Sequence, residues 1–151
     1  MNTFMTSHFT FAELTKTNTG LDNTPTSAQQ SRLRALALIL ENIRGVFGKP
    51  IYINSAFRSP RVNHAVGGSL TSFHLMGTAA DISVYHLSEN DKILLERCIM
   101  SHVPCEFIKY DTFWHVAFDI SKLGREDGQP LTWDAEYPDI ATFKTDKLTD
   151  L

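Results

Sequence analysis

The chain has 151 residues and a formal net charge of −3 with its six histidines neutral. This length suits one domain with a single hydrophobic core, and the 42% apolar and 21% charged fractions are ordinary for a globular protein. The mildly acidic balance argues against a nucleic-acid partner. No stretch approaches the ~20 apolar residues of a bilayer-spanning helix. We therefore expect a monomer with no membrane span.

The first residues and the cysteines indicate a compartment. The segment from Met1 to Thr6 shows no basic stretch followed by an apolar run, so no secretory signal is visible. Cys98 and Cys105 are too few for a disulfide framework and fit a reducing environment. We expect synthesis in the cytoplasm.

Helical signals dominate the first fifty residues. Thr10-Phe-Ala-Glu13 has the pattern of a capping box and predicts a short helix to about Thr17. Ser27-Ala-Gln-Gln30 has the same pattern and predicts the start of a long amphipathic helix, which Gly48-Lys49-Pro50 ends. The apolar residues of that helix recur at helical spacing and predict core packing: Leu33, Leu36, Leu40, Ile43 and Phe47.

The rest of the chain predicts a small sheet. Residues 51–55 and 79–84 are predicted strands, and the segment 57–77 between them lacks periodicity, apart from a helical turn near 60–66, as functional loops often do. Ser88 is the expected cap of a helix to about Ser101, with Ile93, Leu94 and Cys98 facing inward. Two further strands, 106–110 and 113–120, are predicted on either side of a tight turn at residues 111–112.

This order of elements predicts an α+β fold in which N-terminal helices pack on a small, mainly antiparallel sheet. We expect one domain over residues 1–123. The residues 124–151 are polar and mixed, and they predict a C-terminal extension packed on the domain or trailing from it.

Three residues fit a catalytic zinc site, which needs three protein ligands and an open position for water. His74 precedes the strand that carries Asp81, and Gly77 lets the chain turn back between them. His115, on the later hairpin, is the natural third ligand. Asp81 stands in an apolar run, and a buried carboxylate needs a partner. That partner is either a metal ion or Arg58.

The motifs in this region, taken together, resemble the zinc D-alanyl-D-alanine carboxypeptidase family, which includes phage-borne murein endopeptidases and is related to lysostaphin-like and hedgehog-type zinc domains. The resemblance covers roughly residues 9–118. It is carried by these segments, in unbroken order: Ser55-Ala-Phe-Arg58-Ser-Pro60, Asn63, Val66-Gly-Gly-Ser69, Ser72-Phe-His-Leu-Met-Gly-Thr-Ala-Ala-Asp81 and Trp114-His115-Val116.

The resemblance implies a Zn²⁺-dependent peptidase that cleaves an amide bond in murein peptides, either the terminal D-Ala-D-Ala bond or an internal bond such as L-Ala-D-Glu. It implies that His74, Asp81 and His115 bind zinc, that Arg58 contacts substrate and stabilises the oxyanion, and that Ser72 lines the pocket. It also implies a phage or prophage setting, with action on the cell wall after release.

The general base departs from the family pattern. Relatives usually place a glutamate three residues before the last histidine, where this chain has Thr112. The nearest acids are Glu106 and Asp111, and we predict Asp111 as the base because it lies closer to His115 in the sequence. An aspartate in a hairpin turn also has a structural explanation. The alternative function is therefore a zinc-binding module without turnover, acting in recognition or assembly.

Overall fold

The structure is a computed structural model that describes residues 5–120. The predicted extension over 124–151 lies outside the described residues, so the domain boundary at 123 stays a prediction. Within the described part, helices pack on a four-stranded antiparallel sheet, which confirms the α+β class. No helix in these residues is long and apolar enough to cross a membrane.

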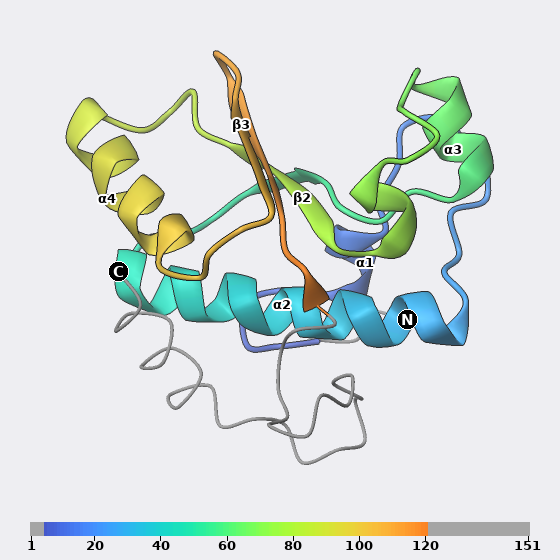
Figure 1. Ribbon diagram of the computed structural model, residues 1–151, viewed down its shortest axis with the longest axis horizontal. Helices are drawn as coiled ribbons and strands as arrows, with labels where there is room; N and C mark the ends of the chain where they lie inside the picture. The colour runs from blue at the N-terminus through green and yellow to red at the C-terminus, as the bar shows by residue number, and fades with distance from the viewer. Residues whose placement is uncertain (1–4, 121–151) are drawn as a thin grey trace.

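The sheet has the order β1-β2-β4-β3 and every neighbouring pair is antiparallel. The β3–β4 hairpin rises from the body of the molecule (Figure 1). The predicted strands are confirmed, although each of the four is shorter at one end: β1 (Ile53–Ser55), β2 (Ala79–Ser83), β3 (Glu106–Lys109) and β4 (Phe113–Ala117).

Between residues 5 and 120, four helices and one 3₁₀ turn surround the sheet. In Figure 1 the long helix α2 runs along its base, with α4 to the left and α3 with the 3₁₀ turn to the right. Their bounds are α1 (Phe11–Leu14), α2 (Ser27–Phe47), α3 (Pro60–Ala65), η1 (Phe73–Met76) and α4 (Glu89–Met100).

Three details of the helices differ from the prediction. Helix α1 ends at Leu14 and not near Thr17. Helix α2 is capped by Thr26, whose side chain accepts from the Gln29 N–H, so its capping box begins one residue earlier than predicted. In α4, Ile93 and Leu94 are 54% and 40% exposed. Cys98 faces inward as predicted, and it shares the buried side of the helix with Leu95 and Ile99, at i, i+3 and i+4 spacing.

The two faces of the sheet have different roles. Successive side chains along a strand alternate between faces. Ile53, Ile82 and Trp114 therefore point into the core that α2 completes, and all three are at most 5% exposed. The opposite face carries Asp81 and His115, which are neighbours of Ile82 and Trp114 in the chain. Alternation thus places an apolar core and a polar site on the same three strands.

Candidate metal centre

The 3₁₀ turn η1 positions His74. Ser72 caps the turn by accepting from the His74 N–H at 3.1 Å. Gly77 ends it at a φ of +81°, a left-handed conformation in which a Cβ atom would lie 3.0 Å from the Gln29 carbonyl oxygen. Glycine is therefore required here by backbone conformation and by space. The turn that the sequence predicted at Gly77 is confirmed, and His74 is only 2% exposed.

Strand pairing positions the other two predicted ligands. Asp81 of β2 lies directly opposite His115 of β4, and Ile108 of β3 lies opposite His115 on the other side. Side chains of directly opposite residues share one face of a sheet. Asp81 and His115 therefore meet on the open face, although 34 residues separate them in the chain.

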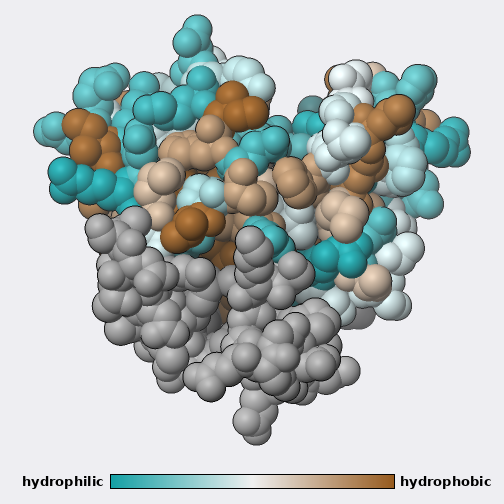
Figure 2. Space-filling model, in the orientation of Figure 1, coloured by the Kyte–Doolittle hydropathy of each residue, from teal (hydrophilic) through white to brown (hydrophobic). Residues whose placement is uncertain are grey.

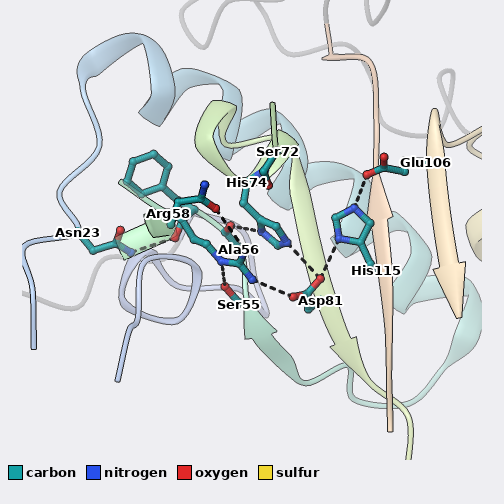
Figure 3. A network of polar contacts seen from close by, with 11 residues as sticks. Asn23, Ser55, Ala56, Arg58, Ser72, His74, Asp81, Glu106 and His115 are labelled. Carbon is teal, nitrogen blue, oxygen red and sulfur yellow. Dashed lines mark hydrogen bonds and ion pairs between the residues drawn. The ribbon is translucent and has the colours of Figure 1, made fainter. Parts of the chain in front are cut away.

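The three predicted ligands converge on one point (Figure 3). Asp81 Oδ1 lies 3.1 Å from His74 Nε2 and 3.0 Å from His115 Nδ1. One donor atom from each residue lies within 4.8 Å of the others, a spacing that could hold a metal ion.

The outer ring nitrogens show that this point suits a cation. His74 Nδ1 lies 2.6 Å from the Ala56 carbonyl oxygen, which can only accept, so Nδ1 carries the proton. His115 Nε2 lies 2.5 Å from a Glu106 carboxylate oxygen and carries its proton for the same reason. In neutral rings the remaining nitrogens then direct lone pairs toward Asp81 Oδ1. A metal ion is the partner that such a donor set fits, and two imidazoles with one carboxylate suit Zn²⁺.

The same contacts shift the pKa values of Asp81 and His115. Burial raises the pKa of Asp81, but its contacts with His115 and His74 outweigh burial and hold this pKa well below its usual 3.8. Burial lowers the pKa of His115, and its contacts with Asp81 and Glu106 more than reverse that effect, so this pKa lies above 6.5. A proton therefore competes with a metal ion for His115 Nδ1.

Arg58 contacts the second oxygen of Asp81. Its Nη2 lies 3.4 Å from Asp81 Oδ2, and its Nε donates to Ser55 Oγ at 3.2 Å. The two alternatives for the partner of Asp81 are thus compatible, because Oδ1 faces the imidazoles and Oδ2 faces the guanidinium. The Arg58 backbone N–H also donates to the His74 carbonyl oxygen at 3.1 Å, which ties the arginine loop to η1.

A cavity of about 330 Å³ opens at this cluster. In the space-filling view the surface is hollowed between the β3–β4 hairpin and the lobe that contains α3 (Figure 2). Ser72 lines the cavity, as predicted, and so does Glu106, whereas the exposed turn residue Asp111 is not among the lining residues. The cavity is lined by Arg58, Ser69, Thr71, Ser72, His74, Asp81, Glu106, Ile108, Tyr110, Phe113 and His115.

Comparison with known proteins agrees with this geometry. A family model described as Peptidase M15 matches residues 7–117, which include all three converging donors. The chain belongs to the Peptidase M15 family. This membership confirms the resemblance seen in the sequence. A curated relative, the zinc D-Ala-D-Ala carboxypeptidase of Streptomyces albus G, is 40% identical over 78 residues. That match covers 50% of this chain but only 31% of the relative.

Sequence reasoning considered Glu106 only as a second choice for the base and missed its contact with His115. The tight turn at residues 111–112 sets the hairpin register, which places Ile108 opposite His115. Glu106 follows two residues away on the same face, where its longer side chain reaches the outer nitrogen of the ring. The hairpin register is the signal that could have identified it.

Proposed function

We propose that this M15 family member is a Zn²⁺-dependent peptidase that hydrolyses an amide bond in murein peptides. One observation carries the proposal: His74, Asp81 and His115 direct one donor atom each to a single point at the base of a cavity. The name of the Streptomyces relative, a zinc carboxypeptidase acting on D-Ala-D-Ala, supports both the metal and the substrate class.

The cavity supplies the groups that such a reaction needs. When bound, zinc would polarise the scissile carbonyl and lower the pKa of a water molecule. Arg58 holds a permanent positive charge at the cavity wall, and its guanidinium can bind a peptide carboxylate or a developing oxyanion. Its ion pair with Asp81 and its bond to Ser55 keep it oriented before substrate arrives.

Glu106 and Asp111, the two acids of the β3–β4 hairpin, have different roles in the proposed reaction. Glu106 accepts from His115 Nε2, so it orients this ring with Nδ1 toward the metal point. Asp111 makes no such contact with a ligand in the described structure, which leaves its carboxylate free to serve as the predicted base once substrate is bound.

Digestion of purified sacculi, with and without a chelator, tests the proposed function. We expect new peptide termini that disappear with the chelator and return with added zinc. Mass spectrometry of these termini identifies the bond: loss of one D-Ala indicates a carboxypeptidase, and a new D-Glu N-terminus indicates an L-Ala-D-Glu endopeptidase. Stoichiometric zinc without any new terminus would refute the peptidase and favour the zinc-binding module.

A further inference from the structure

A second row of side chains crosses the open face of the sheet beside the metal ligands. The Ser83 N–H donates to the Tyr52 carbonyl at 2.9 Å, Ser83 lies opposite Phe113, and the Tyr110 N–H donates to the Phe113 carbonyl at 2.9 Å. These four residues therefore occupy one rung across the sheet, with Tyr52 directly before β1 and Tyr110 directly after β3, and with their side chains on the same face. Ser83 and Phe113 lie two residues along their strands from Asp81 and His115, which is about 7 Å.

This rung is aromatic at both ends. The rings of Tyr110 and Phe113 stack with centroids 4.7 Å apart, and both residues line the metal cavity. At the other end Tyr52 is 55% exposed. The small, buried Ser83 lies between the two aromatic groups.

Two further rings extend the surface past Tyr52. His86 makes edge contacts with Tyr52 at 5.2 Å and with Tyr85 at 5.5 Å, and Tyr85 is 72% exposed. We call Tyr52, Tyr85, His86, Tyr110 and Phe113 the aromatic surface. Exposed aromatic groups that adjoin a binding cavity are typical of contact sites, because tyrosine offers a flat apolar face and a polar hydroxyl at little cost in conformational entropy.

The charges around the aromatic surface favour an uncharged ligand. The segments 50–54, 83–87 and 110–113, which carry these rings, contain no lysine or arginine and a single carboxylate, that of Asp111. Murein peptides bear several carboxylates. The murein glycan consists of N-acetylated amino sugars that are neutral where the peptide is attached, and each pyranose ring has an apolar C–H face that stacks on aromatic rings.

We propose that the aromatic surface binds the murein glycan while the attached peptide occupies the metal cavity. This inference rests on the proposed function, because the cavity must hold a murein peptide for the glycan to lie beside it. The spacing agrees with the covalent bond between the glycan and its peptide. Phe113, in the rung that contains Tyr52, lies two residues along β4 from the predicted ligand His115, which is about 7 Å. A sugar on the tyrosines thus places the first amide bonds of its peptide, the L-Ala-D-Glu bond among them, near the three ligands. The inference therefore favours the endopeptidase alternative of the proposed function, because the terminal D-Ala-D-Ala bond lies farther from the sugar.

Titration of the full chain with N-acetylglucosamine oligomers and with peptide-free murein glycan strands tests the proposal. A chelator is present, so that hydrolysis plays no part. We expect saturable binding that Tyr52→Ser and Tyr85→Ser each weaken about tenfold, which is about 1.4 kcal/mol. Tyr52→Trp keeps a ring face and should bind as the unchanged chain does. The matched control is Ile93→Ser on α4, where the exposed fraction is 54% against 55% for Tyr52.

Several results would overturn the glycan surface. These are no binding by the unchanged chain, binding by both tyrosine-to-serine variants that is as tight as that of the unchanged chain, a loss of the same size in Ile93→Ser, or competition by a soluble murein peptide that lacks sugar. Because Tyr85 lies in an exposed turn, its variant decides the question if Tyr52→Ser does not fold. Hydrolysis of the sugar-free peptide by the zinc-loaded chain is measured separately. If the zinc-loaded chain does not hydrolyse this peptide but the chain still binds glycan, the peptidase is refuted, whereas glycan binding by the aromatic surface is supported.

Discussion

Glu106 should determine how tightly the chain holds zinc although it is not itself a predicted ligand. Its carboxylate lies 2.5 Å from His115 Nε2, and the His115 side chain is only 12% exposed. A carboxylate on the outer nitrogen of a ligand histidine fixes the tautomer and raises the basicity of the metal-facing nitrogen. Glu106→Gln keeps an acceptor oxygen at nearly the same place and removes the negative charge. The variant therefore tests the charge apart from the packing.

The magnitude follows from the exposure of Glu106. Loss of such outer partners typically costs 10–100-fold in metal affinity. The Glu106 side chain is 40% exposed, so solvent screens its charge and the lower end of that range applies. We expect about tenfold weaker zinc binding, or about 1.4 kcal/mol, measured at pH 8 by competition with a chromophoric chelator. With Co²⁺ in place of zinc, the visible absorption bands should shift, since the donor strength of His115 changes.

Glu89→Gln is the matched control, because Glu89 is 87% exposed on α4 and pairs only with Lys92 among the described residues. It should leave zinc affinity and the Co²⁺ spectrum unchanged. Equal zinc affinity in Glu106→Gln and the unchanged chain would refute the orienting role, and so would a loss of the same size in the Glu89 variant.

Three further predictions concern the base, the turn and pH. Asp111→Asn should lower kcat at least 100-fold at unchanged zinc affinity, and kcat within twofold of the unchanged chain would exclude Asp111 as the base. Gly77→Ala should lower the free energy of unfolding in urea by about 2–3 kcal/mol, against about 1 kcal/mol for Gly20→Ala, since both have positive φ but only Gly77 faces a close neighbour. Zinc affinity should fall about tenfold per pH unit as pH drops below the raised pKa of His115, because a proton then competes for Nδ1, and a pH-independent affinity would contradict this.

Local signals predicted most of the fold, and they failed where two residues competed for one role. Thr26 and Ser27 are both good caps with a glutamine three residues on, and the structure selects Thr26. Periodicity located α4 correctly but not its phase, because three apolar residues stand in a row at 93–95 and only Leu95 turns inward. The sequence predicted where the helix lies, whereas packing against the core determined which of its faces is buried.

The predicted ligands show the same difference between what the sequence predicts and what the folded structure determines. His74, Asp81 and His115 were selected by residue type and by family resemblance, and the structure brings them together. Their support was not predictable in this way. The Ala56 carbonyl that orients His74 is a backbone group with no signature in the side-chain sequence, and the Glu106 contact depends on the pairing of β3 with β4. Residue identity thus indicated the chemistry, and strand pairing supplied its geometry.

The register of strand β4 determines the positions of the metal ligand His115, the aromatic residue Phe113 and the core residue Trp114 together. With two residues in the turn, His115 lies opposite Asp81, Phe113 opposite Ser83, and Trp114 points into the core. Because side chains alternate along a strand, a shift of one residue in β4 would place Trp114 on the open face and bury His115. The large, buried Trp114 makes that shift costly, since it would lose its apolar environment. The burial of Trp114 therefore stabilises the sheet, and it also keeps His115, its partner Glu106 and the rung that contains Phe113 at their positions in the register.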